Sequence, residues 1–274
     1  MLLKGKPGAM EVIAMDKGCY IGHNILARHY DHIIASETLY PMGYSSDWHY
    51  HQNPHFSHIL YGGSQEINEN NTKIQQPGEG FYYYPGIAHQ NIQYRVQTRI
   101  FNVELGSGFF EKYQLNIPPE TLMFSENLQL NASGLVKILR EHWLQDDQST
   151  LSINQLTVEL ITHAADNISF FPGWAKKIRP LLYDTWNQPV SLQEISKLLD
   201  IHPVTLSKYF SKYFGCTLGE YRRRIKIERA LPLIRQGKYT LTEIAYLCEF
   251  CDQAHFTKTF HRITGFLPKQ YKAL

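Results

Sequence analysis

Histidine is the residue whose spacing first suggests chemistry in this sequence. His49 and His51 stand two residues apart in DWHYHQ, and His89 closes the later turn PGIAH. Residues two apart in a strand point to the same side, so the imidazoles of His49 and His51 face one direction. Neutral imidazoles that converge inside a protein can hold iron, manganese or zinc. A metal site is therefore one interpretation of these residues.

The same histidines also suit a pocket for a small polar molecule. Imidazoles can hydrogen-bond such a molecule and neighbouring aromatic rings can stack on it, which is the combination that a ligand pocket needs. A third interpretation is structural, with histidines that close the ends of strands. We predict the pocket, with no metal and no cofactor, and with a sugar or similar polar metabolite as the effector. Its predicted lining residues are Trp48, His49, His51, His55, Tyr82, Tyr84 and His89.

An internal repeat indicates a second kind of chemistry, the reading of DNA bases. The stretch from Ser191 to Gly215 is echoed from Leu241 to Gly265, and each copy reads as a short amphipathic helix, a tight turn and a second helix. This is helix-turn-helix spacing, in which the exposed N-terminal half of the second helix reads base edges in the major groove. The residues predicted to contact DNA are Val204, Thr205, Ser207, Lys208, Lys212, Gln253, Ala254, His255, Thr257, Lys258 and Arg262.

Three segments of the C-terminal part carry a family resemblance. They are LQEISKLLDIHPVTLSKYFSKYFG, the joining segment TLGEYRRRIKIERALPLI, and the run IAYLCEFCDQAHFTKTFHRITGFLPKQY. Together they resemble the AraC/XylS family of bacterial transcription regulators, and the last run looks like the family signature. The resemblance implies two helix-turn-helix units joined by a long helix, with both second helices in successive major grooves on one side of the DNA.

Four residues depart from that family pattern. Asp200 and Glu249 stand in the turns where the family usually has glycine, and a side chain there costs free energy if the backbone φ is positive. Lys226 replaces the usual arginine of the joining helix. Pro232 lies inside that helix, where the loss of a backbone hydrogen bond predicts a kink or an early end.

Residues up to Leu105 read as short strands, rich in β-branched and aromatic residues and separated by turns. The strand candidates are TLYPMGY, HFSHILYGG, FYYYPG and RIFNVEL. The segment DWHYHQNPHFSHILYGG, followed by PGEGFYYYPGIAHQN, looks like the two motifs of the cupin barrel, a common sensor domain of the AraC family. That resemblance places His49, His51 and His89 where metal-binding cupins keep histidine ligands, and His55 where a carboxylate is usual.

The predicted fold class is a two-domain α+β chain. An N-terminal all-β, cupin-like barrel is followed by helices and by a C-terminal all-α domain with two helix-turn-helix units. We place the effector-binding domain at residues 1–108, a helical linker and dimerisation segment at 109–172, with FFPGW as the linker itself, and the DNA-binding domain at 173–274. One helix of the middle segment could pack on its own barrel or form a dimer face. The residues on that face are Leu151, Leu156, Leu160 and Ile161.

Charge is distributed unevenly along the chain. Of the 27 Lys and Arg, seventeen follow residue 172, together with only eight of the 25 Asp and Glu. A basic C-terminal part on an acidic body suits a phosphate-binding domain joined to one that need not touch nucleic acid. The segment MLLKGKPGAMEVIAMDKG lacks the apolar core of a signal peptide, and no stretch is long enough to span a bilayer, so we expect a cytoplasmic protein.

The four cysteines are too few and too clustered for a secreted disulfide framework. Cys248 and Cys251 form a C-x-x-C without a second pair to complete a zinc site, and a redox sensor is a weaker alternative. A metal-dependent enzyme is another, against which the missing carboxylate and the family resemblance argue. We expect a transcriptional regulator, not an enzyme, that binds double-stranded promoter DNA and a small-molecule effector, forms a homodimer and does not bind membranes. If it is an activator, it should also contact RNA polymerase.

Overall fold

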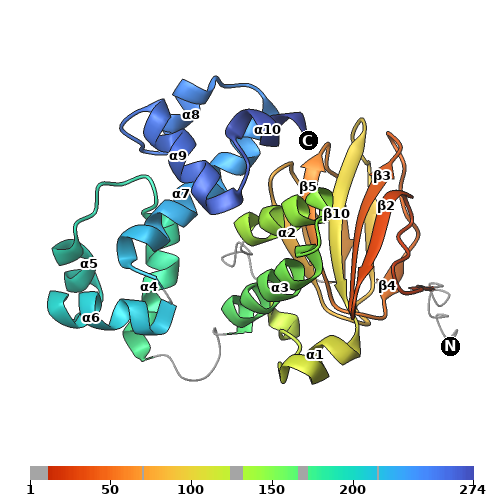
Figure 1. Cartoon of the computed structure of the whole chain (residues 1–274), viewed down its shortest axis with the longest axis horizontal. Coiled ribbons are helices and arrows are strands. Elements are labelled where there is room, and N and C mark those ends of the chain that lie inside the picture. The colour runs from red at the N-terminus through yellow and green to blue at the C-terminus, as the bar shows by residue number, and fades with distance from the viewer. Residues whose placement is uncertain (1–11, 70, 124–131, 166–171, 215) are drawn as a thin grey trace, which may run out of the picture.

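Two regions of different secondary structure make up the chain. The computed structural model describes residues 12–69, 71–123, 132–165, 172–214 and 216–274. Strands occupy the N-terminal region up to Leu105, and helices follow (Figure 1). The strands are β1 (Ile13–Met15), β2 (His23–Tyr30), β3 (Ile33–Tyr40), β4 (His49–His51), β5 (His55–Tyr61), β6 (Gln65–Asn68), β7 (Thr72–Ile74), β8 (Gly80–Tyr83), β9 (His89–Ile92) and β10 (Thr98–Leu105).

These strands form two separate sheets. One has the order β1-β4-β9-β6-β7 and the other the order β2-β3-β10-β5-β8. Among the described strands no ladder joins one sheet to the other, so the predicted cupin barrel is not closed and the region is an open two-sheet sandwich. The edge strands β1 and β7 have three residues each, which is too short to carry a ladder around a barrel.

The second sheet is held by long antiparallel pairing. In it, β10 lies between β3 and β5, with Thr98 opposite Tyr40 and Glu104 opposite His55. The predicted strand TLYPMGY supplies only the last three residues of β3, because Gly43 adopts a φ of 74° in the turn that follows. The polar strands β6, QEIN, and β9, HQNI, carry no apolar alternation and were not predicted.

Helices cover the outer face of the sheet that contains β10. They are α1 (Ser107–Tyr113), the short 3-10 helix η1 (Glu120–Leu122), α2 (Ala132–Leu144) and α3 (Ser149–Ala165). Phe101, Val103 and Leu105, which alternate along β10, point toward them and are fully buried with Leu135 and Ile161. This helix-to-sheet core is the largest apolar cluster of the N-terminal region.

The predicted dimer face of α3 packs mostly within the chain. Leu160 and Ile161 are fully buried in the helix-to-sheet core, and Leu156 is half-buried against it. Leu151, in contrast, is 66% exposed. The structure therefore uses three of these four residues to pack α3 on its own sheet.

The C-terminal region is helical. Its helices are α4 (Gly173–Asp184), α5 (Leu192–Leu198), α6 (Pro203–Phe214), α7 (Leu218–Gln236), α8 (Leu241–Leu247), α9 (Gln253–Thr264) and α10 (Pro268–Ala273). Because α7 continues through Pro232 to Gln236, the early end, one of the two outcomes predicted for this helix, does not occur. The predicted linker FFPGW falls partly on residues 166–171, which lie outside the described residues. No helix in the described part of the chain is long and apolar enough to cross a membrane.

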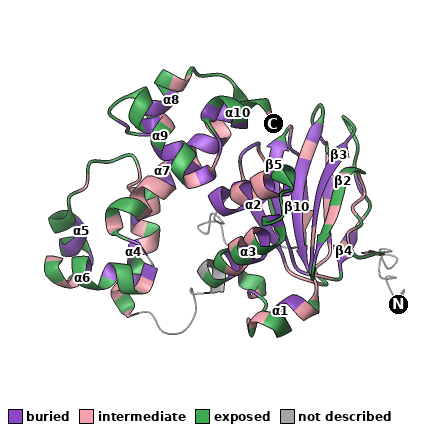
Figure 2. Ribbon diagram, viewed as in Figure 1, coloured by how far each residue is buried: buried purple, intermediate pink, exposed green. Residues whose placement is uncertain are grey.

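Two apolar cores divide these helices. One joins α4, α5 and α6 to the start of α7, and the other joins the end of α7 to α8, α9 and α10. The second core also contains Ala132 and Val136 of α2, packed with residues such as Ile227 and Phe260. Figure 2 shows buried residues where α2 meets α7 and α9. The N-terminal region and the second half of the C-terminal region therefore share one core.

A close approach of two backbones marks the same boundary. Gly78 adopts a φ of +88°, and a Cβ added there would collide with the backbone of Leu231 and Pro232 in α7. Only glycine fits this position, because it tolerates positive φ and has no Cβ.

Candidate DNA-binding surface and histidine cluster

The first helix-turn-helix unit, residues 191–214, contains α5, a turn and α6. Ser191 caps α5, since its hydroxyl accepts a hydrogen bond from the Glu194 N–H at 3.2 Å. The Glu194 carboxylate accepts one from the Ser191 N–H at 2.7 Å, and this bond lowers the pKa of Glu194. This capping box satisfies two backbone donors and fixes where the helix begins. Pro203, which needs no N–H partner, opens α6.

The second unit, residues 240–264, is built in the same way. Thr240 and Glu243 form the capping box of α8, with bonds of 3.2 Å and 2.7 Å. Asp252 caps α9 by accepting a hydrogen bond from the His255 N–H at 2.7 Å, and Gly265 ends the helix with a φ of 79°. The first helices of the two units, α5 and α8, therefore begin with equivalent capping boxes.

Both turns contain the strained residue that the sequence predicts. Asp200 has a φ of 53° and Glu249 a φ of 57°. For a residue with a Cβ, this left-handed conformation costs about 1–2 kcal/mol. In the second unit, Lys226 Nζ donates a hydrogen bond to the Glu249 carbonyl oxygen at 2.8 Å. The lysine of the joining helix therefore holds this turn.

The predicted DNA-contact residues lie on the outside of both units. In α6, Val204, Ser207, Lys208 and Lys212 are exposed and Thr205 is half-exposed. Fully buried Leu206 and Phe210 hold the opposite side of that helix. In α9, Gln253, Ala254, His255 and Lys258 are exposed and Thr257 is half-exposed. Phe256 and Phe260, on the opposite side of α9, are fully buried. The phase predicted for the two helices is therefore confirmed at these positions.

One position differs from the predicted phase, and two others stand apart from the rest of the predicted set. Tyr209, expected on the inner face of α6, is 37% exposed, and the Lys208 ammonium lies 5.4 Å from its ring centre. His261 was not among the predicted contacts, although its outward phase was visible in the repeat. It lines a shallow hollow on α9 with Gln253, Ala254, Thr257, Lys258 and Leu267.

Arg262 is the third. It lines a cleft with Lys137 of α2, Glu159 of α3, and Glu220 and Arg224 of α7. This cleft lies where the N-terminal region meets the C-terminal helices. The structure therefore groups Arg262 with the boundary between the regions and not with the hollow on α9.

The C-x-x-C pair lacks the features of a redox motif. Cys248 is fully buried in the second unit, and burial raises the pKa of its thiol to about 12. Reactive thiols have a lowered pKa and some exposure. Cys251 is exposed, with its sulfur 3.2 Å from His255 Nδ1. These two environments do not support a redox sensor.

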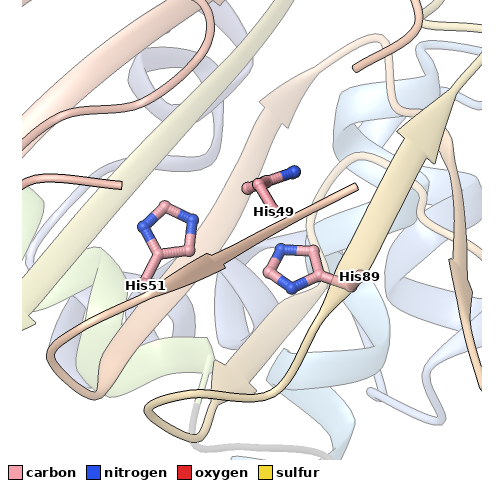
Figure 3. Close-up of side chains that lie close together, drawn as sticks. All are labelled: His49, His51 and His89. Atoms are coloured by element: carbon pink, nitrogen blue, oxygen red, sulfur yellow. The ribbon is translucent and has the colours of Figure 1, made fainter. Parts of the chain in front are cut away.

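In the N-terminal region, three predicted effector residues form one group, which we call the histidine cluster: His49, His51 and His89. His49 pairs with His89 across β4 and β9. The ring centres lie 4.4 Å apart for His49 and His89, 5.4 Å for His49 and His51, and 5.7 Å for His51 and His89. One ring nitrogen from each residue lies within 4.8 Å of the other two (Figure 3). All three side chains are buried.

Burial sets the protonation of the histidine cluster. Loss of water disfavours imidazolium, which lowers the pKa of His49 and of His89 to about 4. The pKa of His51 and that of neighbouring His55 are also lowered, mainly by burial and further by nearby imidazoles. All four rings are therefore neutral at pH 7.

Backbone carbonyl groups orient two of these rings. His49 Nδ1 lies 2.8 Å from the Asp47 carbonyl oxygen, and His89 Nδ1 lies 3.2 Å from that of Ile87. A neutral ring beside such an acceptor carries its hydrogen on that nitrogen, so Nε2 keeps a lone pair. His51 Nδ1 is buried without a hydrogen-bond partner.

The remaining predicted effector residues are not all beside the histidine cluster. His55 comes from the other sheet and its ring centre lies 4.4 Å from that of His51. Trp48 is half-buried next to His49 in the chain. Tyr82 faces the other way, since it packs on Phe56 in the helix-to-sheet core and its hydroxyl donates to the Pro118 carbonyl oxygen at 2.8 Å.

The alternation of side chains along the chain explains why Tyr82 does not face the histidine cluster. Tyr84 packs against the same helix-to-sheet core, whereas Tyr83 points between the sheets and stacks on His55 at 4.5 Å. The predicted pair Tyr82 and Tyr84 therefore has the wrong phase, and Tyr83 is the residue that the prediction missed. Tyr20, with its ring centre 5.2 Å from that of His51, was missed as well, because no strand pattern marks its loop.

A polar network continues from the histidine cluster between the sheets. The Tyr83 hydroxyl donates to Glu66 Oε2 at 2.5 Å, and Gln75 Nε2 donates to the same oxygen at 2.7 Å. Glu66 is buried, which raises the pKa of its carboxyl group. The space between the sheets thus holds hydrogen-bonded polar groups beside aromatic rings.

Several known proteins are similar to this chain. Residues 195–273 match a family model described as a helix-turn-helix domain. Over 251 residues the chain is 22% identical to the probable transcriptional regulator LumQ of Photobacterium leiognathi, covering 83% of this chain and 92% of LumQ. It is 25% identical to the transcriptional activator RhaS of Shigella boydii over 114 residues, 42% of this chain and 38% of RhaS. A solved structure of apo ToxT from Vibrio cholerae aligns with a TM-score of 0.37 and 13% identity, covering 88% of this chain and 97% of that one.

The paired units and these relatives define a helix-turn-helix DNA-binding protein. More particularly, the relatives that the chain resembles are transcriptional regulators of the AraC family. The match to RhaS is limited to part of that protein, so its activity as a whole is not carried over.

Proposed function

We propose that the protein is a one-component regulator in which α6 and α9 enter successive major grooves of promoter DNA. These grooves lie about 34 Å apart along the DNA axis. One observation supports this most strongly. The two units have equivalent capping boxes on α5 and α8, and they present polar and basic residues on the exposed sides of α6 and α9, while apolar residues bury the opposite sides. A helix of this kind fits the major groove and reads bases with its exposed residues. The expected place of action is the cytoplasm, where the DNA lies.

We further propose that the N-terminal region is the sensor. The ligand expected from the sequence is a small polar metabolite such as a sugar, and the buried polar network between the sheets supports a polar ligand. Tyr82 and Tyr84 do not contribute to that support, because they pack against the helices. The aromatic residues beside the histidine cluster are Tyr20 and Tyr83.

Strand β5 connects this region to α10, which shares the apolar core of the second unit. His55 at its start contacts His51, whereas His58, three residues later, reaches α10, where its Nε2 lies 2.9 Å from the Tyr271 hydroxyl. Arg235 of α7 donates hydrogen bonds to the carbonyl oxygens of Tyr271 and Lys272, both at 2.9 Å. A ligand that shifts β5 would therefore change how the second unit is held, and so shift the balance between two arrangements of the DNA-binding helices.

Lysine variants of the full chain test the DNA-binding proposal. We expect sequence-selective binding to the promoter nearest its own gene, with an affinity that falls steeply as salt increases. Lys208→Ala and Lys258→Ala should each lose about 1–3 kcal/mol if the lysine contacts a guanine, and each should lose protection in a different half of the footprint. Lys269→Ala, an exposed lysine of α10, is the matched control. Equal footprints for all four proteins would contradict the proposal.

The assembly and output of the regulator belong to the same proposal. We expect a homodimer on DNA, and contact with RNA polymerase if the protein activates transcription. Light scattering of the protein with and without DNA measures the first, and transcription with purified polymerase measures the second and gives the sign of regulation.

A further inference from the structure

We propose that a cleft between the helices, which we call the boundary cleft, binds a small phosphate ester. It is the cleft lined by Lys137 of α2, Glu159 of α3, Glu220 and Arg224 of α7, and Arg262 of α9. The boundary cleft is separate from the effector pocket, because α2 and α3 cover the outer face of the sheet that contains β10, whereas the histidine cluster lies on the other sheet. Binding of the ester is independent of the function proposed above, but an effect on transcription rests on that function.

Three cationic side chains from three different helices converge in the boundary cleft. Lys137 comes from α2, Arg224 from α7 and Arg262 from α9. The apolar core that α2 shares with α7 and α9 fixes their backbones, and its residue Val136 immediately precedes Lys137. Figure 1 shows α2 beside α7 and α9. The three charges are therefore positioned by packed helices and not by loops.

These cations have no close anionic partner in the part of the chain that the structure describes. The ion pairs found there involve other side chains. Lys137, Arg224 and Arg262 also donate no side-chain hydrogen bond to a described residue. Like charges that are held together repel, so an anion bound among them would stabilise this arrangement.

The two glutamates of the boundary cleft are at its rim and have hydrogen-bond donors of their own. Both are exposed, whereas the cations of α2 and α7 are half-buried. The Glu220 carboxylate accepts hydrogen bonds from the N–H and the hydroxyl of Thr217, both at 2.8 Å, in the capping box of α7. Glu159 Oε1 accepts one from Gln155 Nε2 at 3.3 Å. The deeper part of the cleft is therefore cationic.

The surroundings of Lys137 favour an added negative charge. Burial lowers the pKa of its ammonium group, Glu159 opposes this shift, and the positive charge of Arg224 adds to it. The pKa is lowered overall, so Glu159 does not offset both the loss of water and the repulsion. An anion between Lys137 and Arg224 would supply the missing negative charge.

The arrangement of the cations selects the class of anion. A guanidinium binds phosphate through two parallel hydrogen bonds, and a lysine ammonium binds it as a point charge. A terminal phosphate group directs three oxygens in different directions and can meet cations from three helices, whereas a carboxylate has two oxygens in one plane.

The size and walls of the boundary cleft limit the rest of the ligand. Its space of about 200 Å³ is smaller than the roughly 300–1,000 Å³ of pockets for drug-sized molecules. Leu160 and Ile263 form apolar walls, which suit a short carbon chain. The ligand is therefore a small phosphate ester.

A bound ester would hold the two regions of the chain together. Lys137 belongs to the N-terminal region, whereas Arg224 and Arg262 belong to the C-terminal helices. A ligand that needs all three cations binds only the packed arrangement, so it stabilises that arrangement over any in which the regions separate. The position of α9 relative to the N-terminal region is thereby linked to the concentration of the ester.

Calorimetric titration of the full-length protein with glycerol 3-phosphate, at constant ionic strength, tests the site. We expect one ester per chain and much weaker binding of acetate. Lys137→Gln and Arg224→Gln should each weaken binding about tenfold or more, because each removes a charge-assisted hydrogen bond. Lys238→Gln removes one positive charge from an exposed position outside the cleft, so it is the matched control and should bind like the wild type.

A second readout follows the helices around the boundary cleft. Circular dichroism of each variant shows whether it is folded. In the wild type, glycerol 3-phosphate should increase the protection of α2 and α9 from amide hydrogen exchange, and in folded Arg224→Gln this increase should be lost.

Several results would overturn the proposal. They are the absence of stoichiometric binding, binding that Lys137→Gln and Arg224→Gln do not weaken, equally tight binding of acetate, or binding that is lost in Lys258→Gln instead. DNA binding of the same proteins is measured separately. Weaker DNA binding of Arg224→Gln, in a protein that binds no ester, would assign this arginine to the DNA backbone and overturn the site. Ester binding by a protein without selective DNA binding would contradict the proposed function alone.

Discussion

The two helix-turn-helix units have matching internal structure and different surroundings. Each begins with a capping box and turns through a residue at positive φ. The first unit is completed by α4 and the start of α7, whereas the second shares its core with Ala132 and Val136 of the N-terminal region. This difference teaches that two units of matching internal structure have different neighbours, since among the described residues the second shares an apolar core with the N-terminal region and the first does not.

The largest expected losses of stability come from removing one buried ring from each of the two C-terminal cores. Phe210→Ala and Phe260→Ala each remove a fully buried ring and should each cost about 3–5 kcal/mol. Hydrogen exchange should show the loss of protection confined to α4, α5, α6 and the start of α7 for Phe210→Ala. For Phe260→Ala the loss should extend into α2, because the core is shared. Loss of protection in α2 for both variants would contradict the difference between the units.

Gly78 gives the next effect, on the contact between the second unit and the N-terminal region. Gly78→Ala combines positive φ with a collision against the backbone of α7, so we expect a loss on the order of 3 kcal/mol. Gly43→Ala is the matched control, because Gly43 has a φ of +74° with no atom within 4 Å of its added Cβ. Denaturant unfolding of both variants should give a larger loss for Gly78→Ala. Equal losses would mean that the close approach is unimportant.

Acid should destabilise α10, which shares the core of the second unit, before it destabilises the first unit. Burial, with help from Arg235, lowers the pKa of His58 to about 3, below the value of about 6.5 expected in the unfolded chain. The stabilisation from neutral His58 is therefore complete above about pH 6.5 and is lost as the pH falls toward 3, by up to about 1.4 kcal/mol per pH unit. His58→Gln should reduce this pH dependence. The measurement is the protection of α10 from amide hydrogen exchange relative to that of α6, after correction for the pH dependence of intrinsic exchange. A variant with unchanged pH dependence would assign the effect to other groups.

Removing a helix cap should give the smallest loss of stability. Comparing the two caps tests whether the two units are energetically equivalent. Ser191→Ala and Thr240→Ala each remove one cap and should each cost about 1 kcal/mol. Local exchange in α5 and α8 measures the two losses. Clearly unequal losses would show that the surroundings also change the energetics of the caps.

The C-terminal helices were predictable because their signals are local. The spacing of Leu206 and Phe210, and of Phe256 and Phe260, marks the buried sides, and the capping residues mark where helices begin. Asp200, which stands in a turn where the family usually has glycine, does have a positive φ. The passage of α7 through Pro232 was not predictable, because the helix is held there by packing against residues far away in the chain.

The N-terminal region was harder to predict because its contacts are between distant segments. The turn motif was enough to single out His89, but its register opposite His49 depends on the pairing of β4 with β9. The phase of Tyr82 was predicted wrongly, because a sheet buried on both faces shows no alternation between apolar and polar residues. The shared core with α2 left no signal at all, since Ala132 and Val136 look like ordinary helix residues.

The contact between His58 and Tyr271 joins residues 213 positions apart, which matters for how the chain is made. At about 5–20 residues per second, a ribosome finishes Tyr271 roughly 10–40 s after His58. During that interval the first unit can complete its own core, while the outer side of α2 and the ring of His58 face water. We therefore expect the second unit to dock last, onto the packed surface of the N-terminal region.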